Sequence, residues 1–188
     1  MKPKLGWCVT ASFCTFEKTI LEMDVISEIY DIIPIMSFNS VNIDSRYGKA
    51  SEHIRKITDI CGREPIITIE DAEPIGPKNM TDIMLIAPCT GNTLAKLAHS
   101  ITDTPVTMAI KSHLRNNKPV VIALSTNDAL AGTMKNIAEI ANIKNYYFVP
   151  LVQDDIISKP TSLSADLDKI ESALEFATLG TQLRPMIV

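Results

Sequence analysis

The sequence predicts an α/β fold with an open, mostly parallel sheet and helices on both faces. Short apolar segments of strand length alternate along the chain with segments in which apolar residues recur at helical spacing. Such alternation is typical of parallel sheets, because two parallel strands need a crossover connection that is usually a helix. No internal repeat or low-complexity linker interrupts the chain. We therefore expect residues 1–188 to form one Rossmann-like (flavodoxin-like) domain.

The first part of the chain predicts two strands, each followed by a helix. "LGWCVTAS" (residues 5–12) and "DIIPIMS" (residues 31–37) are apolar segments of strand length. In residues 16–29 the apolar side chains lie three or four positions apart, which indicates a helix. A second helix is predicted for residues 48–62, where Gly62 provides the stop signal.

The middle of the chain contains one loop, one strand and two helices. Residues 64–79 hold three prolines and no helical period, so we expect a loop with a short strand at "IITI". "DIMLIAP" (residues 82–88) is the third predicted strand, and residues 92–101 form the helix after it. The next helix, residues 105–117, begins with a proline, which is tolerated at the first helical position because its missing N–H needs no partner there.

The C-terminal part predicts two more strands and two more helices. The strands are residues 118–125 and 145–152, and a helix that Gly132 weakens covers residues 127–142 between them. The closing helix is predicted for residues 161–180. Ser164 is its expected N-cap, acidic residues fill its first turn and a glycine ends it.

Charge and composition exclude several classes of protein. The net charge is -4 and there is no basic block, so we expect no nucleic-acid partner. The apolar runs are too short to span a bilayer, and the N-terminal one is too short and polar for a signal peptide. The four cysteines and three histidines are dispersed, without a Cys-x-x-Cys pair. We therefore expect a cytoplasmic protein with reduced thiols and no metal site.

Small polar residues follow four of the predicted strands. Ligands of open parallel sheets bind beyond the carboxyl ends of the strands, and hydroxyls, amides and helix-start N–H groups suit a phosphate. The alternative for single residues, such as Thr90 and Asn92, is an ordinary N-cap. The residues assigned to an anionic ligand are Thr10, Ala11, Ser12, Ser37, Pro88, Cys89, Thr90, Gly91, Asn92, Thr93 and Ser125.

The predicted ligand is a mononucleotide with a single phosphate, such as FMN. The first strand is followed by "TASFCTF", which lacks the Gly-x-Gly-x-x-Gly pattern that brings backbone close to the pyrophosphate of NAD. A P-loop pattern is also missing. A small cradle lined by hydroxyls fits one phosphate better than two. Cys89 has two interpretations here: a thiolate stabilised at a helix N-terminus, or a small residue that the turn requires.

At these residues the sequence resembles the flavin-containing cysteine decarboxylase superfamily. "APCTGNTLAKLA" is similar to its Pro-Ala-Ser-Ala-Asn-Thr motif, and Asn127 in "ALSTNDA" takes the place of the Asn in its Pro-x-Met-Asn motif. Thr10–Ser12 and Ser37 fall where that superfamily holds the flavin phosphate. Over nearly the whole chain, segments such as "DAEPIGPKN" and "NYYFVPLVQDD" resemble the dipicolinate synthase B-subunit family of sporulating bacteria.

This resemblance implies a function and its partners. The implied function is oxidation of a dihydrodipicolinate-type precursor to dipicolinate in the mother-cell cytoplasm, together with a dipicolinate synthase A-subunit that binds NADP. It also implies FMN as cofactor and a homo-oligomer, either a trimer or a dodecamer. Asn127 is the implied catalytic residue, because its amide can donate to a substrate carboxylate or a flavin carbonyl. The alternative for Asn127 is an N-cap for a helix from Asp128.

Departures from the superfamily keep two other functions open. The region "TIEDAEPIGPKNMTD" lacks the histidine that decarboxylases carry before their motif, and Thr126 replaces the Met before Asn127. Both changes disfavour a decarboxylase, whereas a prenyltransferase stays an alternative. The first loop also lacks the glycine of flavin-binding relatives, which favours an accessory protein that binds a ligand without redox chemistry.

Three pairs of charged or titratable residues remain with two interpretations each. Arg115 and Lys118 either attract a dicarboxylate or complement a helix dipole. His53 and His113 lie on predicted helices, as surface or capping residues or as bases. The pair Asp154–Asp155 either faces a partner or a metal, or lies in a solvated loop.

Overall fold

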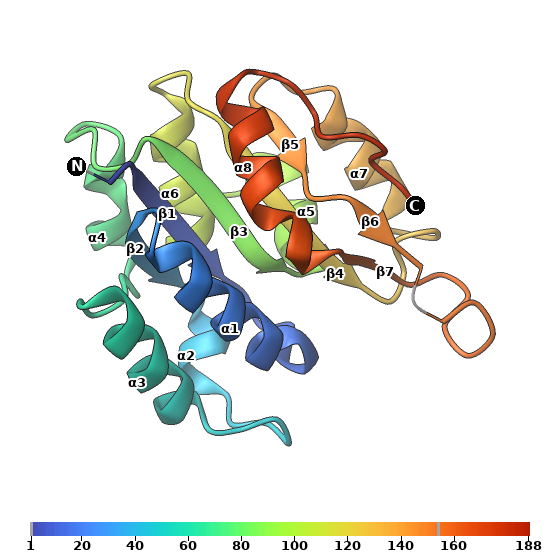
Figure 1. Cartoon of the computed structure of the whole chain (residues 1–188), viewed down its shortest axis with the longest axis horizontal. Helices are drawn as coiled ribbons and strands as arrows, with labels where there is room; N and C mark the ends of the chain where they lie inside the picture. The colour runs from blue at the N-terminus through green and yellow to red at the C-terminus, as the bar shows by residue number, and fades with distance from the viewer. Residues whose placement is uncertain (1, 154) are drawn as a thin grey trace.

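A mostly parallel sheet with helices on both faces forms the molecule, which confirms the predicted fold class (Figure 1). The computed structural model describes residues 2–153 and 155–188. Within these residues the strands are β1 (Lys4–Val9), β2 (Asp31–Met36), β3 (Ile83–Cys89), β4 (Val120–Thr126), β5 (Tyr146–Phe148), β6 (Leu151–Val152) and β7 (Leu163–Ala165). The strand order is β2-β1-β3-β4-β7-β6, and β5 also pairs with β4. Only β7 runs antiparallel to its neighbours, β4 and β6.

Two layers of helices cover the sheet. One face packs against α1 (Phe16–Ser27), α3 (Ala50–Cys61) and α8 (Ile170–Thr178). The other face packs against α4 (Ile69–Ala72), α5 (Gly91–Ala98), α6 (Pro105–Leu114) and α7 (Met134–Ala141). The shorter elements are α2 (Phe38–Asn42) and three 3₁₀ helices, η1 (Phe13–Thr15), η2 (Glu73–Ile75) and η3 (Leu167–Lys169).

The centre of the sheet is buried on both faces. All seven residues of β3 are buried, and β1 is buried from Leu5 to Val9. Trp7 is completely buried, and its indole N–H donates to the carbonyl of Ala87 at 2.9 Å. Continuous burial explains why these strands read as unbroken apolar runs rather than as alternating patterns.

Several sequence signals act locally as predicted. Gly62 ends α3 in the left-handed region, with φ of 65°, which suits a residue without a Cβ. Pro105 is the first residue of α6, and Thr104 caps that helix through a capping box with Thr107. Thr90 caps α5, because its hydroxyl accepts the N–H of Thr93 at 3.2 Å.

The predicted loop at residues 64–79 is wrong in part. Thr68 caps the short helix α4 by accepting the N–H of Asp71 at 3.1 Å, and η2 follows with Pro74 near its start. The expected strand at "IITI" is reduced to one bridge between Ile66 and Ile35. The side-chain cap starts a helix where the apolar residues alone indicated a strand.

The helix predicted for residues 127–142 begins later, at Met134. Asp128 holds the turns between β4 and α7, because its backbone carbonyl accepts the N–H groups of Ala131 and Thr133. Its carboxylate accepts the hydroxyls of Thr126 and Thr133 as well. Local hydrogen bonds of this kind compete with the helical pattern, so Asn127 is not an N-cap.

The predicted last strand and closing helix are also shorter than expected. The strand at residues 145–152 divides into β5 and β6 at Pro150, which has no N–H for a ladder. Residues 163–165 form β7 against β4 instead of starting a helix. Ser164 therefore pairs with Ser125 and is not an N-cap, and α8 begins only at Ile170.

The predicted surface or capping histidines are both buried. His113 is 1% exposed, where Thr81 Oγ1 lies 2.8 Å from its Nδ1 and the Pro119 carbonyl lies 3.1 Å from its Nε2. Because a carbonyl only accepts, Nε2 carries the proton and Nδ1 accepts the hydroxyl of Thr81. Burial lowers the pKa of His113 to about 4, against a weaker opposite effect of the Pro119 carbonyl.

The cations Arg115 and Lys118 lie at the amino ends of the strands. Lys118 precedes β4, and its ammonium donates to the carbonyl of Thr81 at 2.6 Å. Arg115 is the C-cap residue of α6. A ligand at the carboxyl ends of the strands therefore lies at the opposite edge from both. None of the helices formed by the described residues is long and apolar enough to cross a membrane.

We predict that His113 makes the stability of the protein depend on pH. The pKa of His113 in the folded chain lies below the unfolded value of about 6.5. At a pH between these two values, His113 is protonated in the unfolded chain and neutral in the folded chain. The free energy of unfolding should therefore fall as the pH drops from about 6.5 to about 4, by roughly 3 kcal/mol in total. Urea unfolding across this pH range measures it. In His113→Gln, which keeps a donor for Pro119, this part of the slope should disappear; an unchanged slope would contradict the assignment.

Candidate functional site

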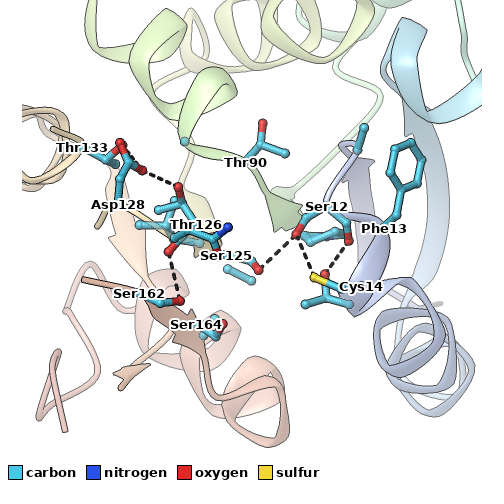
Figure 2. Close-up of a pocket in the computed structure, with 18 of the residues that line it drawn as sticks. Ser12, Phe13, Cys14, Thr90, Ser125, Thr126, Asp128, Thr133, Ser162 and Ser164 are labelled. Atoms are coloured by element: carbon cyan, nitrogen blue, oxygen red, sulfur yellow. Dashed lines mark hydrogen bonds between the residues drawn. The ribbon is translucent and has the colours of Figure 1, made fainter. Parts of the chain in front are cut away.

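A cleft of about 1190 Å³ lies at the carboxyl ends of β1, β3 and β4 (Figure 2). The loop after β1, the loop between β3 and α5, and the turns after β4 form its walls. The turn after α2 and the segment around β7 complete them. Eight residues predicted from the sequence line this cleft, namely Ala11, Ser12, Pro88, Thr90, Gly91, Asn92, Ser125 and Asn127.

Thr10 does not line the cleft as predicted but supports its wall. The side chain is 1% exposed, and its hydroxyl donates to the carbonyl of Pro88 at 2.8 Å. The same oxygen accepts the N–H of Thr90 at 2.9 Å. Thr10 thereby joins the end of β1 to both sides of the turn that leads into α5. Its hydroxyl has no hydrogen to spare for a ligand.

Ser37, Cys89 and Thr93 are also buried rather than exposed to the cleft, contrary to the prediction. Ser37 caps α2 by accepting the N–H of Ser40 at 3.3 Å. The hydroxyl of Thr93 accepts from that of Thr90 at 3.1 Å. Cys89 is completely buried, and burial raises the pKa of its thiol. Cys89 is therefore not the reactive thiolate that one interpretation allowed.

Two serines from different strands meet at the floor of the cleft. Ser12 follows β1 and Ser125 belongs to β4, and the hydroxyl of Ser12 donates to that of Ser125 at 3.1 Å (Figure 2). The carbonyl of Ser12 accepts the hydroxyl of Thr15 at 2.8 Å, which holds the loop against the first turn of η1. Both serines are half-buried. They present hydroxyl groups to a ligand from a fixed position.

The N-terminus of α5 opens into the cleft at Gly91. The first N–H groups of a helix lack partners within it, and here these belong to Gly91 and Asn92. A Cβ at Gly91 would lie 2.8 Å from Thr126 Oγ1 and 3.0 Å from Thr133 Oγ1. Glycine therefore lets α5 approach the turn after β4 closely. This positions N–H dipoles that favour an anion at the cleft wall.

Asn127 and Asp128 occupy the turn between β4 and α7. Asn127 is exposed in the cleft, and its backbone carbonyl accepts the hydroxyl of Thr161 at 2.7 Å. The hydroxyls of Thr126 and Thr133 donate to Asp128 at 2.6 Å and 2.8 Å and lower the pKa of that carboxyl. Asp128 is thus an ionised brace for the turn that carries Asn127.

Two other walls of the cleft carried no recognisable signal in the sequence. Ser162, Ser164 and Asp166 line it from the β7 segment, and Arg46 and Tyr47 line it from the turn after α2 (Figure 2 for the β7 serines). The pattern of the β7 segment predicts a helix, so its polar residues were not expected at the end of a strand, where a ligand binds. Nothing in the pattern around "DSRYGK" indicated that it returns to the carboxyl ends of β1 and β3.

The described residues hold no group of three His, Cys, Asp or Glu side chains placed to bind a metal ion. Of the acidic pair that followed the last predicted strand, Asp154 lies outside the described residues. Asp155 accepts the N–H groups of Ile157 and Ser158, so it braces its own turn.

We predict that the Thr10 hydroxyl is needed for the shape of the cleft wall. Thr10→Val has the same outline but leaves the carbonyl of Pro88 and the N–H of Thr90 without this partner, which should cost about 1–3 kcal/mol of stability. Denaturant unfolding monitored by circular dichroism measures the loss. Thr10→Ser keeps the hydroxyl and is the matched control. Equal stability of the Val variant and the wild type would show that the two hydrogen bonds of the Thr10 hydroxyl do not stabilise the fold.

Comparison with known proteins agrees with this geometry. A family model described as Flavoprotein matches residues 1–176. The dipicolinate synthase B-subunit of Bacillus subtilis (strain 168) is 40% identical over 186 residues, covering 98% of this chain and 93% of that protein. The crystal structure of the dipicolinate synthase B-subunit from Bacillus halodurans matches with a TM-score of 0.90 and 37% identity, over 100% of this chain and 98% of that one.

A more distant structure shares the fold alone. Burkholderia xenovorans DmrB, solved in complex with FMN and described as a cubic protein cage for redox transfer, has a TM-score of 0.69 at 20% identity. The match covers 93% of this chain and 94% of that one. The family model spans most of the sequence, and the Bacillus subtilis relative is similar along nearly its whole length. The chain therefore belongs to the Flavoprotein family.

Proposed function

We propose that this chain is the B-subunit of a dipicolinate synthase, which binds FMN and acts with an A-subunit to oxidise a dihydrodipicolinate-type precursor to dipicolinate. The observation that carries the proposal is the cleft where hydroxyls of three strand ends meet the first N–H groups of α5. Open parallel sheets bind nucleotides at this edge. The Bacillus subtilis and Bacillus halodurans relatives, which carry this name, support it.

The cleft fits FMN in size and in chemistry. Its volume of about 1190 Å³ exceeds the roughly 300–1,000 Å³ of common small-molecule sites, which leaves room for a flavin and a small substrate. The phosphate donors we assign are the N–H groups of Gly91 and Asn92 with the hydroxyl of Ser125, because Ser12 and Thr90 give their hydroxyl hydrogens to Ser125 and Thr93. When bound, FMN supplies a planar ring that accepts a hydride.

The residues of the chain orient the substrate for this chemistry. Converting a dihydropyridine dicarboxylate to the aromatic pyridine removes one hydride and one proton, and a bound flavin would supply the hydride acceptor. The amide of Asn127 is exposed in the cleft and can donate to a substrate carboxylate. Asp128 keeps the Asn127 turn in place. No histidine is among the described residues that line the cleft.

The partners follow from the same proposal. The A-subunit supplies NADP. The chain itself assembles as a homo-oligomer, a trimer or a dodecamer built from trimers. The site of action is the cytoplasm of the mother cell in a sporulating bacterium.

The flavin assignment predicts that the purified protein binds FMN and that Gly91 is needed for it. Gly91→Ala forces α5 away from Thr126 and Thr133 and should weaken FMN binding at least tenfold, because the N–H donors shift. Gly132→Ala is the matched control, since its Cβ would meet only Asp128 Oδ2, at 3.4 Å. Quenching of flavin fluorescence measures both affinities. A wild-type protein that stays colourless and ignores added FMN removes the redox-flavin proposal.

The assignment of Asn127 predicts a loss of turnover without a loss of cofactor. Asn127→Ala should bind FMN normally but form dipicolinate with the A-subunit at least about tenfold more slowly, because one donor to the substrate is gone. Asn142→Ala serves as the control, because Asn142 caps α7 outside the cleft. Absorbance of dipicolinate follows the reaction. If Asn127→Ala turned over at the wild-type rate, Asn127 would have no role in catalysis.

A second candidate function is that of an accessory protein without its own redox chemistry. It is favoured by the loop after β1, "TASFCTF", which contains no glycine for close approach of a flavin. Dipicolinate formation by the A-subunit, by this chain and by both together, each with and without FMN, separates the two functions. Full activity of the A-subunit alone would support the accessory role, whereas FMN-dependent activity of the pair alone would support the redox role.

A further inference from the structure

We propose that Arg46 recognises a carboxylate of the substrate, and that Gly48 and the ring of His53 position the turn that carries it. Arg46 and Tyr47 lie in the turn between α2 and α3 and line the cleft. No catalytic or binding pattern in the sequence marks this turn. The proposal rests on the proposed function for the identity of the anion, which is a planar dicarboxylate.

The turn is a defined structure rather than a loose connection. Ser45 and Gly48 exchange backbone hydrogen bonds of 3.0 Å and 3.1 Å, which closes the turn with Arg46 and Tyr47 at its tip. The hydroxyl of Ser45 also accepts the N–H of Tyr47 at 3.1 Å. Asp44 accepts the N–H of Ala50 at 2.9 Å and ties the turn to the start of α3. The tip therefore has a fixed place above the first turn of α3.

The guanidinium of Arg46 is oriented but has no anionic partner. It donates to the hydroxyl of Tyr47 at 2.7 Å and lies 4.9 Å from the centre of that ring. Within the described residues it makes no ion pair, although Arg63, Lys96 and Lys118 each do. A planar guanidinium held against an aromatic ring keeps its fork of N–H groups available for a carboxylate.

His53 supports the turn from below by its shape. The ring is 6% exposed and meets the ring of Phe16 edge-on, with 5.0 Å between centroids. Phe16 in turn contacts Phe13, which lines the cleft, at 5.3 Å. Neither ring nitrogen of His53 makes a hydrogen bond. A buried polar ring without partners is costly, and this one fills the space beneath the tip.

Gly48 is the contact between the turn and this ring. Its φ of +132° is a conformation that residues with a Cβ rarely adopt. A Cβ at this position would lie 2.8 Å from Nε2 and 3.0 Å from Cε1 of His53. Burial, and then Lys56, lower the pKa of His53, against weaker opposite effects of Glu52 and the Tyr47 backbone. The ring is therefore mainly neutral at pH 7, and Arg46 is the cation of this turn that lines the cleft.

Charge is distributed unevenly across the cleft. Arg46 follows β2 and Lys18 belongs to α1, on the β2–β1 side of the sheet. Asp128 and Asp166 line the other side, beyond β4 and β7, where Lys159 is the cation. A dianionic substrate is attracted to the first side and repelled by the carboxylates of the second. A phosphate already finds its donors at the start of α5, so a carboxylate is the oxyanion left for Arg46.

Titration calorimetry with pyridine-2,6-dicarboxylate at pH 7.5 tests the proposal. The variant Arg46→Gln should bind this probe at least about tenfold more weakly than the wild type, because a charge-assisted pair is lost. Arg46→Lys should fall between them, because an ammonium lacks the planar fork. Arg55→Gln makes the same change of charge on an exposed part of α3 outside the cleft, and should bind as the wild type does.

Flavin titrations of the same variants distinguish the two sources of oxyanion. Arg46→Gln should keep its affinity for FMN and for riboflavin. If it loses affinity for FMN but not for riboflavin, Arg46 holds the flavin phosphate and the proposal is overturned. Dicarboxylate binding that is equal in Arg46→Gln and the wild type, or undetectable in the wild type, also overturns it. A wild type that binds no FMN but needs Arg46 for the dicarboxylate leaves this proposal standing and rejects the redox-flavin function.

A pair of glycine variants tests the positioning role of Gly48. Gly48→Ala should weaken dicarboxylate binding at least about tenfold without changing FMN affinity, because the tip of the turn is displaced from the ring of His53. Gly62→Ala is the matched control at the other end of α3, with φ of +65° and no atom within 4 Å of its Cβ. Both variants carry backbone strain, so both should melt at lower temperature. Unchanged dicarboxylate affinity in Gly48→Ala would show that the turn needs no such support.

Discussion

The parallel pairing of β1, β3 and β4 is the constraint on which the rest of the structure depends. These strands are buried on both faces, so their register is set by apolar packing along their whole length. Parallel strands end at the same edge of a sheet. Ser12, Pro88 and Ser125, which are far apart in the sequence, are therefore brought to one cleft. Loops could not hold these groups at fixed distances without that buried support.

The polar residues at this edge form two sets, one buried in the wall of the cleft and one accessible to a ligand. Thr10 and Ser37 turn inward and satisfy backbone groups of the turns that follow the strands, and Thr93 turns inward and accepts the hydroxyl of Thr90. Ser12, Thr90 and Ser125 remain accessible from the cleft. Two buried groups of the first set hold Thr90 of the second: Thr10 accepts its backbone N–H and Thr93 accepts its hydroxyl. A ligand thus meets donors that are already oriented, which lowers the entropy cost of binding.

The two proposed anion sites lie at different parts of one cleft and attract an anion in different ways. The start of α5 offers N–H dipoles, which suit a phosphate that approaches the backbone closely. The turn with Arg46 offers a full charge on a long side chain, held by Tyr47 and supported through Gly48 by His53. Carboxylates of Asp128 and Asp166 on the opposite wall add a repulsive element. Attraction on one side of the cleft and repulsion on the other favour one arrangement of the flavin and the dicarboxylate over the reverse arrangement.

The sequence by itself determined the α/β class, the four strands that build the centre of the sheet and the polar residues at their ends. It could do so because burial on both faces leaves long apolar runs, and because helix signals such as Thr90, Pro105 and Gly62 act within one helical turn. Only the tertiary structure decided which polar residues face the cleft, where α7 and α8 begin, and that β7 lies beside β4. Those outcomes depend on partners distant in sequence: Ser164 pairs with Ser125, and the ring of His53 lies under Gly48 and against Phe16. Propensity and spacing describe a residue's neighbours along the chain, whereas these positions are fixed by contacts that exist only after the sheet has formed.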